Sequence, residues 1–228
     1  MPDSLEIGFV LFPDLTQLDL TGPWEVLTRV PGARCHLLAR DLAPVASNSG
    51  GLAIVPTMTF AAAPQLDVLC VPGGPGHLVA MENPELLEFL RRQAEGCRFV
   101  TAVCTGSLVL AAAGLLHGRR ATTHWMSLQR LARFGAQPVK ARVAHDGKFV
   151  TGGGVTAGID FGLALAEQLG GKTLSQTIQL AIEYDPHPPH AGSPDSADPA
   201  VVEAINARAE PYRARMAEVD ARAAARFA

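Results

Sequence analysis

Apolar runs alternate with segments of helical spacing along most of the chain. Four runs are typical of strands: residues 5–12 (LEIGFVLF), 34–40 (RCHLLAR), 66–74 (LDVLCVPGG) and 98–103 (RFVTAV). The run at 66–74 is continuously apolar, as expected of a strand covered on both faces. Residues 52–56 (LAIVP) predict a short edge or hairpin strand. Two β-rich runs on either side of Asp146-Gly147 predict a hairpin.

Helical spacing and helix-boundary residues complete the alternation. The spacing predicts helices over 84–96, 104–118, 126–135, 156–171 and 173–184. An earlier helix is expected to start at Pro23, with Thr21 or Gly22 near its N-cap. Residues 185–199 are Pro-rich and predict an extended loop, followed by a C-terminal helix over 200–228 that is interrupted near Pro211.

Strands that alternate with helices predict an α/β fold with a mainly parallel sheet and helices on both faces. We expect residues 1–228 to form a single domain, because no linker interrupts the alternation before Tyr184. Ligands bind at the carboxyl ends of the strands in such folds. This rule selects Val71–Gly76, Val103–Thr105 and the loop after Phe12.

Composition narrows the class of protein. Of 228 residues, 48% are hydrophobic and 18% are charged, which is typical of a globular chain with a sizeable core. The net charge of -3, with no basic cluster beyond pairs such as Arg91-Arg92, argues against a nucleic-acid partner. The opening residues carry no signal-peptide pattern, and their apolar run is too short for a bilayer. We therefore expect a cytoplasmic protein without a membrane segment.

The chain has four cysteines, Cys35, Cys70, Cys97 and Cys104. Their spacing matches neither a CxxC motif nor a zinc site, so we expect free thiols and no metal. Cys104 lies where a strand runs into a helix, close to unpaired helix N–H groups. Such a position is expected to lower a thiol pKa from about 8.5 toward roughly 4–7, which would make Cys104 a nucleophile. The other three are interpreted as bystanders.

Other residues are candidates for the same site. The amides of Gly73 and Gly74 in PGGPG could hold an anion or a polar intermediate, although a plain tight turn explains this string equally well. Asp19 in QLDLTGP is a carboxylate among leucines, which is costly without partners; a helix-capping Asp is the alternative. No dinucleotide or phosphate-loop pattern occurs, so no nucleotide cofactor is expected. Three histidines could approach Cys104 in the folded protein: His124, His187 and His190.

Four stretches together resemble the DJ-1/PfpI superfamily: FPDLTQLDLTGPWEVL, LDVLCVPGGPG, VCTGSLVLAAAGLLHGRRATTHW and TGGGVTAGIDFGLALAEQL. The resemblance implies a flavodoxin-like three-layer sandwich with a nucleophilic Cys104 at a strained strand-helix elbow. Within the superfamily the chain looks most like the isocyanide hydratases of the cyclohexyl isocyanide hydratase type, and this similarity extends through QLAIEYDPHPP and AGSPD. Protease and deglycase members carry His directly after the cysteine, where this chain has Thr105.

The resemblance implies a homodimeric hydro-lyase that needs no metal or organic cofactor and converts an isocyanide, R–NC, to an N-substituted formamide. Its working residues correspond to Cys104, Thr105 and Asp19. Our hypothesis is that the Cys104 thiolate attacks the terminal carbon while Asp19 donates a proton, which gives a thioimidate. Asp19 would then activate water. Burial must raise the pKa of Asp19 above its usual 3.9 or so for this to work.

Two alternatives remain. The first is a ligand-sensing domain, because AraC-type regulators contain a similar domain followed by helix-turn-helix motifs that this sequence does not show. The second is another activity of the superfamily, such as a cysteine-based redox sensor, a glyoxalase-like enzyme or a chaperone.

Overall fold

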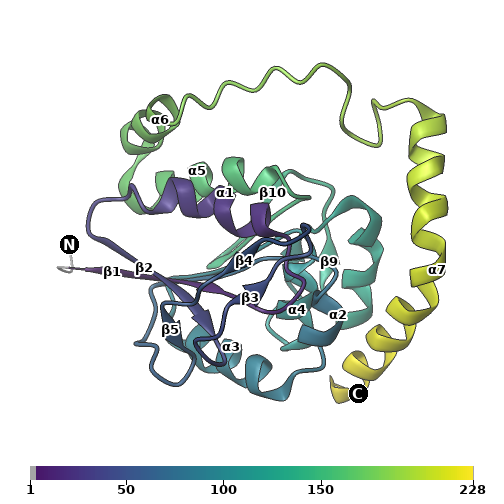
Figure 1. Cartoon of the computed structure of the whole chain (residues 1–228), viewed down its shortest axis with the longest axis horizontal. Coiled ribbons are helices and arrows are strands. Elements are labelled where there is room, and N and C mark those ends of the chain that lie inside the picture. The colour runs from purple at the N-terminus through teal and green to yellow at the C-terminus, as the bar shows by residue number, and fades with distance from the viewer. Residues whose placement is uncertain (1–3, 228) are drawn as a thin grey trace.

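Seven strands form one twisted sheet in the computed structural model, which describes residues 4–227 (Figure 1). Their order is β10-β11-β7-β6-β1-β2-β5, and every neighbouring pair is parallel except the β10–β11 hairpin. The strands are β1 (Leu5–Val10), β2 (Ala33–Ala39), β5 (Met58–Thr59), β6 (Val68–Val71), β7 (Phe99–Val103), β10 (Val143–Asp146) and β11 (Phe149–Gly152).

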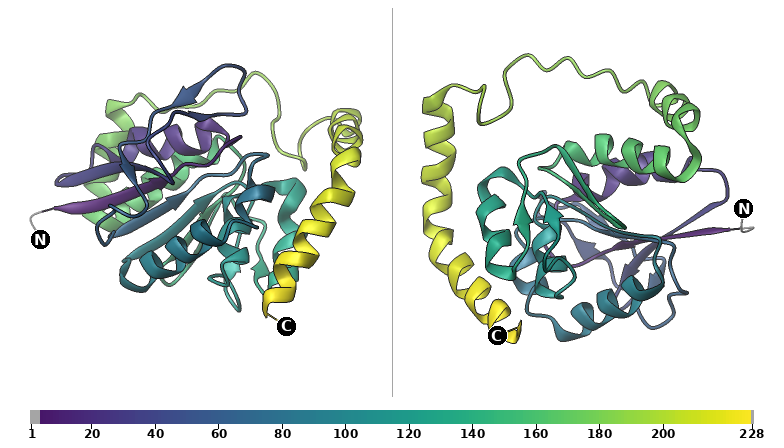
Figure 2. Two further views of the ribbon diagram at one scale, coloured as in Figure 1. Left: turned by 60° about the horizontal axis from the view of Figure 1, so that its bottom comes forward. Right: turned by 180° about the vertical axis from the view of Figure 1, so that it is seen from behind.

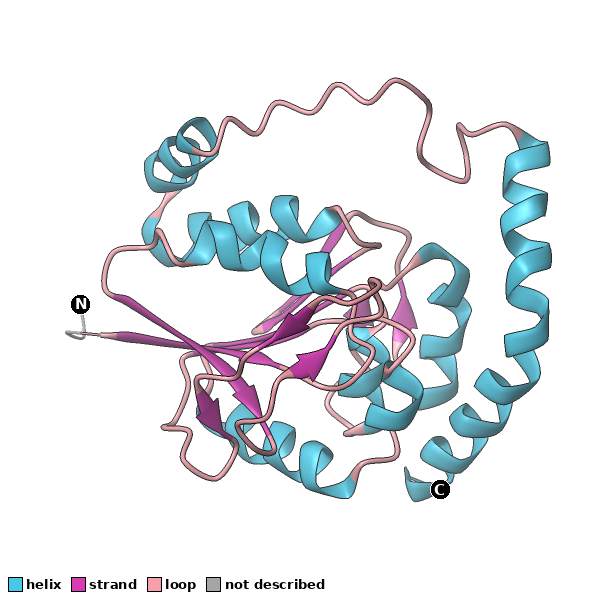
Figure 3. Ribbon diagram, viewed as in Figure 1, coloured by secondary structure: helices cyan, strands magenta, loops and turns pink. Residues whose placement is uncertain are grey.

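Helices cover both faces of this sheet, which confirms the predicted α/β, flavodoxin-like sandwich (Figures 1 and 3). Helices α1 (Gln17–Leu27) and α5 (Ala157–Gly170) lie on one face, and α3 (Pro84–Gly96) and α4 (Gly106–Ala112) lie on the other. The remaining helices are α2 (His77–Ala80), α6 (Lys172–Ala181), α7 (Pro199–Ala224) and the 3₁₀ segments η1 (Trp125–Phe134) and η2 (Ala225–Phe227). No helix within residues 4–227 is both long and apolar enough to cross a membrane.

Most predicted elements are confirmed. Helix α3 occupies the predicted range, with Pro84 in its first turn and the Asn83 side chain accepting from the Leu86 amide. The strand expected at 52–56 is half of a hairpin, in which β4 (Ala53–Ile54) pairs with β3 (Val45–Ala46). A second small parallel pair joins β8 (Arg120–Ala121) and β9 (Gln137–Pro138). The segment predicted as a helix at 126–135 is the 3₁₀ segment η1.

The predicted start of the first helix is wrong. Helix α1 begins at Gln17, and Pro23 lies inside it. Proline lacks the amide that would bond the Asp19 carbonyl one turn earlier, a cost of about 3 kcal/mol in a helix interior. Burial of Leu20, Val26 and neighbouring apolar side chains offsets this cost. The earlier start places Asp19 in the first turn of the helix.

Two further helix predictions need correction. Helix α4 covers Gly106–Ala112 rather than 104–118, because Cys104 and Thr105 form a turn before it and Gly114, with a φ of 81°, follows its end. Helix α7 runs through Pro211 without interruption. Helix-forming Ala, Arg and Glu residues flank that proline on both sides. Ala228, the last residue of the predicted 200–228 helix, and residues 1–3 of the predicted domain lie outside the described residues.

Glycines allow α1 and α5 to pack closely on their face of the sheet. A Cβ atom on Gly162 would lie 3.0 Å from Val26 Cβ and 3.2 Å from Pro23 Cα. A Cβ atom on Gly158 would lie 3.0 Å from Pro23 Cδ. The contact between these helices therefore leaves little room for side chains at the two positions, and it fixes the helix that carries Asp19.

We predict that Gly162→Val lowers the free energy of unfolding by about 1–3 kcal/mol, because the added methyl groups push α5 away from α1. Urea denaturation followed by circular dichroism measures this change. The matched control is Glu167→Val, which introduces the same side chain at an exposed position of α5. Equal stability of the two variants would contradict the close-packed contact.

Candidate active site

The carboxyl ends of four adjacent strands meet at one edge of the sheet. Strands β11, β7, β6 and β1 are neighbours and run parallel, so the loops that follow them converge. Cys104 and Thr105 follow β7, and Gly73 and Gly74 follow β6. Asp19 comes from α1, which follows β1. The structure thus brings all five predicted site residues together.

Cys104 occupies a strained turn between β7 and α4. Its φ is 57°, in the left-handed region that residues with a side chain rarely adopt. Its amide donates to the carbonyl oxygens of Gly152 and Gly153, at 3.1 and 3.0 Å. Its carbonyl accepts from the hydroxyls of Thr123 and Ser107, at 2.8 and 3.1 Å. These bonds hold the elbow that the family resemblance led us to expect.

Gly106 allows this elbow to close against the end of β6. A Cβ atom there would collide with the carbonyl oxygen of Val71 and would lie 2.6 Å from that of Pro72. Backbone atoms cannot move aside as a flexible side chain can, so only glycine fits. The first turn of α4 therefore lies directly beside the glycine-rich loop.

Asp19 is a buried carboxyl beside that loop, with 1% of its surface exposed. Its Oδ2 accepts from the Gly73 amide at 3.1 Å. Its Oδ1 is buried and has no hydrogen-bond partner of standard geometry within residues 4–227. The Cys104 thiol lies close to the carboxyl and acts on it as a hydrogen-bond donor. An unsatisfied buried carboxylate oxygen is costly, which favours a proton on this group.

Thr105 contacts the glycine loop. Its Oγ1 accepts from the Gly74 amide at 3.0 Å and lies 3.3 Å from the Gly74 carbonyl oxygen. A Cβ atom on Gly73 would lie 2.5 Å from the Thr105 nitrogen and 3.0 Å from Asp19 Oδ2, so glycine is needed here too. The Thr105 hydroxyl orients Gly74 in this loop, and the amide of the preceding residue, Gly73, donates to Asp19.

Burial raises the pKa of Asp19 from 3.8 to about 7, and this is the largest effect on the group. The Cys104 thiol and the Gly73 amide, as hydrogen-bond donors, act in the opposite direction and lower it. The direction and size of the shift agree with the expectation that Asp19 holds a proton near neutral pH.

The expectation of a lowered thiol pKa at Cys104 is wrong. Burial and the neighbouring Asp19 raise the pKa of Cys104, and they outweigh the amides of Thr105 and Val155, which lower it. The amide effect expected at a helix start is present but smaller than the cost of desolvation, because Cys104 is only 5% exposed. The two acids are neighbours, so the charge of each affects the titration of the other, and the pKa of Cys104 lies above that of Asp19.

Two groups near the site were missed by sequence reasoning. The Val155 amide reaches the sulfur from the loop after β11. The TGGGV string belongs to a stretch that carries the family resemblance, but no role in the site was predicted for it. His77 Nδ1 lies 2.8 Å from the Gly74 carbonyl oxygen. The placement of a histidine just after PGGPG was the available signal for that contact.

The other candidate side chains make no hydrogen bond to Cys104 or Asp19 among the described residues. His187 and His190 are exposed in the loop between α6 and α7. His124 is half-buried and faces Gly154, and burial lowers its pKa. Cys35, Cys70 and Cys97 are free thiols outside the site, and burial raises the pKa of each to about 12. Among residues 4–227, no group of three or more His, Cys, Asp or Glu side chains is arranged to hold a metal ion.

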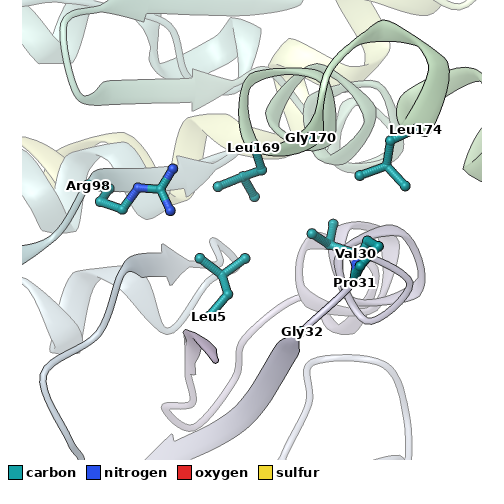
Figure 4. A pocket seen from close by; sticks show the side chains of 8 residues that line it. All are labelled: Leu5, Val30, Pro31, Gly32, Arg98, Leu169, Gly170 and Leu174. Atoms are coloured by element: carbon teal, nitrogen blue, oxygen red, sulfur yellow. The ribbon is translucent and has the colours of Figure 1, made fainter. Parts of the chain in front are cut away.

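A small cavity of about 170 Å³ lies at the opposite edge of the sheet (Figure 4). It is near the amino ends of the strands, since Leu5 begins β1 and Arg98 precedes β7. Its lining is Leu5, Val30, Pro31, Gly32, Arg98, Leu169, Gly170 and Leu174. None of the predicted site residues belongs to it.

This chain is similar to known proteins in sequence and in fold. Residues 6–168 match the DJ-1/PfpI family. The chain is 53% identical to isonitrile hydratase from Pseudomonas putida over 225 residues, 98% of each protein. It is 33% identical over 187 residues to the HTH-type transcriptional regulator GbdR of Pseudomonas aeruginosa, covering 78% of this chain and 50% of the regulator. A solved THiJ/PfpI family protein from Pseudomonas syringae superposes with a TM-score of 0.90 at 42% identity, covering 97% of this chain and 90% of that chain.

The buried carboxyl should make stability depend on pH in a defined direction. A carboxyl whose pKa rises from 3.8 unfolded to about 7 folded destabilises the folded state progressively as pH rises between these values. We predict that Asp19→Asn is more stable than the parent by about 2–4 kcal/mol at pH 8, and that the gain shrinks toward pH 4. Urea unfolding across pH 4–8 measures it. Asp41→Asn, at an exposed site, is the control, and a pH-independent gain would exclude the buried proton.

Proposed function

Because this chain belongs to the DJ-1/PfpI family, we propose that it is an isonitrile (isocyanide) hydratase, a cofactor-independent hydro-lyase that adds water to R–NC and releases an N-substituted formamide. The 53% identity to isonitrile hydratase, over 98% of both proteins, is the observation that carries this proposal. The site offers matching chemistry, because a small neutral substrate needs a nucleophile and a nearby proton donor rather than a charged pocket.

In the first step the Cys104 sulfur forms a bond to the terminal carbon of the isocyanide. The reacting form of the pair has a thiolate at Cys104 and the proton on Asp19. The pKa of Asp19, raised to about 7, makes the carboxyl a good proton acceptor for the thiol, but the pKa of Cys104 is raised too, so the proton rests on sulfur and moves to Asp19 as the reaction begins. The carboxyl transfers its proton to the same carbon, which gives the thioimidate R–N=CH–S–Cys104 and leaves Asp19 ionised. The elbow fixes the sulfur before substrate arrives.

In the second step Asp19 takes a proton from water, and the hydroxide adds to the thioimidate carbon. The hydroxyl proton of this adduct then moves to nitrogen as the carbonyl forms and the carbon–sulfur bond breaks. The bonding electrons return to sulfur, so the products are R–NH–CHO, the Cys104 thiolate and protonated Asp19. One carboxyl therefore acts first as an acid and then as a base.

Backbone amides stabilise charge in both steps. The Thr105 and Val155 amides act on the sulfur, and the Gly73 amide acts on Asp19. Thr105 keeps Gly74, and with it Gly73, in place through its hydroxyl. The Gly73 amide thus positions the carboxyl and the Gly74 amide positions Thr105, so the expected role of these amides in holding a polar intermediate or water is replaced by one in holding the catalytic side chains.

We further propose that the enzyme works as a cytoplasmic homodimer on a small-molecule substrate. The family resemblance supports the dimer. Exposed apolar side chains on α6 and α7 are suited to contact with a second copy: Leu180, Val201, Ile205 and Tyr212.

Ligand sensing is a second candidate function. The similarity to GbdR favours it, because a regulator could use the same domain to bind a small molecule. The two functions differ in a simple observation: a sensor binds its ligand unchanged, whereas a hydratase releases a new formamide on every cycle.

We predict that the purified protein converts a simple alkyl isocyanide to the formamide. Chromatography measures the formamide as it forms. Cys104→Ala should lower kcat by about 10⁴-fold or more because no covalent intermediate can form. Asp19→Asn should lower it by about 10²–10⁴-fold because the proton transfers lose their carrier. Cys35→Ala, outside the site, serves as the control. Formamide production by Cys104→Ala at the parental rate would exclude covalent catalysis.

We predict that rapid acid quenching during turnover captures an adduct on Cys104. The thioimidate adds the whole mass of the isocyanide, because the thiol hydrogen is matched by the new C–H bond. Peptide mass spectrometry locates the modification. An adduct on Cys70 or Cys97 in place of Cys104 would refute the assignment of the nucleophile.

A further inference from the structure

A buried ion pair joins the C-terminal helix to the body of the protein. Arg130 of η1 donates from Nε and Nη2 to the two carboxylate oxygens of Asp220 on α7, at 2.9 and 2.8 Å. The Asp220 side chain is 1% exposed and that of Arg130 is 11% exposed. Burying two charges is expensive, and exposed contacts alone could dock a helix, so this pair calls for a further explanation.

The third member of the cluster is His77, at the start of α2. Arg130 Nη1 lies 3.0 Å from His77 Nε2. A guanidinium can only donate, so Nε2 is the acceptor and the imidazole proton lies on Nδ1. Burial, followed by the nearby Arg130 charge, lowers the pKa of His77 to about 3, which keeps the ring neutral. The ion pair therefore fixes one tautomer of the histidine.

That tautomer points its proton at the active site. His77 Nδ1 donates to the Gly74 carbonyl oxygen at 2.8 Å. Gly74 has a φ of 121°, where side chains are excluded, so its peptide has no side chain of its own to hold it. The same residue donates to Thr105 Oγ1, and the preceding amide of Gly73 donates to Asp19. Hydrogen bonds from Asp220 to Gly74, and then the backbone from Gly74 to Gly73, connect α7 with the Asp19 carboxyl.

We propose that Asp220, Arg130 and His77 are positioning residues for the hydration reaction, holding the Gly73-Gly74 loop in the orientation that fixes Asp19. This inference rests on the proposed function. His77 acts on Gly74, Arg130 sets the tautomer of His77, and Asp220 compensates and orients Arg130. None of the three touches the reacting atoms.

This assignment gives the C-terminal helix a role in the site. Asp220 lies beyond residue 168, where the family match ends, on a helix reached through the long loop that arches away from the sheet (Figure 2). Its last turns return to the body, where Val219, Asp220 and Ala223 are buried. Helix α7 is thus a working part of one domain with the sheet.

Two variants of His77 separate the hydrogen bond from simple packing. His77→Asn keeps an amide donor near the position of Nδ1, whereas His77→Leu fills space without a donor. We expect His77→Leu to lower kcat about tenfold with KM changed less than about twofold. The Gly74 carbonyl then keeps only its bonds from the residue-77 backbone amide and the Thr105 hydroxyl, so the loop holds Asp19 less firmly. His77→Asn should recover at least half of the lost activity on a logarithmic scale.

Asp220→Asn and Arg222→Gln form a matched pair on α7. Arg222 also ties the helix to the body, through Glu82 at 2.6 Å, but this pair is exposed and does not reach His77. Asp220→Asn should lower kcat about tenfold, while Arg222→Gln should leave it within about twofold. Equal losses in the two variants would mean that α7 acts only through its docking.

A second readout does not depend on isocyanide turnover. The rate of Cys104 alkylation by iodoacetamide, followed by peptide mass spectrometry across pH, reports the titration of the coupled pair. The Gly73 amide lowers the pKa of Asp19, so a loosened loop should move the midpoint upward by about 0.5–1 pH unit. The shift should occur in His77→Leu and Asp220→Asn, and the Arg222→Gln profile should match the parent.

These outcomes keep the two proposals apart. If the parent protein yields no formamide, the proposed function fails, and the alkylation profiles still decide whether the cluster acts on Asp19. If His77→Leu and Asp220→Asn are folded by circular dichroism yet keep the parental kcat and midpoint, the positioning role is overturned. Equal activity of His77→Asn and His77→Leu would also overturn it, because the hydrogen bond would then be irrelevant.

Discussion

A proton held between two buried acids is the constraint on which the site depends. Asp19 and Cys104 lie in a place where neither is readily ionised alone, because burial raises the pKa of both groups. Together they can carry one negative charge and one proton, which is the combination that a nucleophile and its acid partner require. The glycines at 73 and 106 bring the backbone close enough to both groups to stabilise that charge.

The fold supplies this pair by bringing distant segments to one edge of the sheet. Parallel pairing of β11, β7, β6 and β1 places four loops side by side, and each contributes one kind of group. The loops provide an amide from Val155, the thiol, the glycine amides and the carboxyl. The regulator GbdR shares sequence with most of this chain, whereas isonitrile hydratase shares it over 98%. In this chain the residues beyond 168 add contacts to the body such as that of Asp220.

Local patterns predicted the strands, helix α3 and the cysteine elbow, because these features depend on residues close in sequence. A buried strand is a continuous apolar run in the sequence, and Cys104 directly follows the run that forms β7. The start of α1 was misplaced because Pro23 is a good first residue of a helix, and only tertiary packing shows that it lies inside one. The thiol pKa was predicted with the wrong sign, since the degree of burial is a property of the whole fold. The Arg130–Asp220 pair joins residues 90 positions apart, and neither local spacing nor composition indicates such a contact.

The depth at which Asp19 and Cys104 lie has a consequence for how a catalytic cycle is completed. In the proposed steps, one negative charge moves between the Cys104 sulfur, the Asp19 carboxyl and the bound adduct. The net charge of the site therefore stays at minus one throughout. Isocyanide, water and formamide, the species that must enter or leave, are all electrically neutral. Burial that excludes ions is therefore no barrier to turnover, because every species that the cycle exchanges with solvent is neutral.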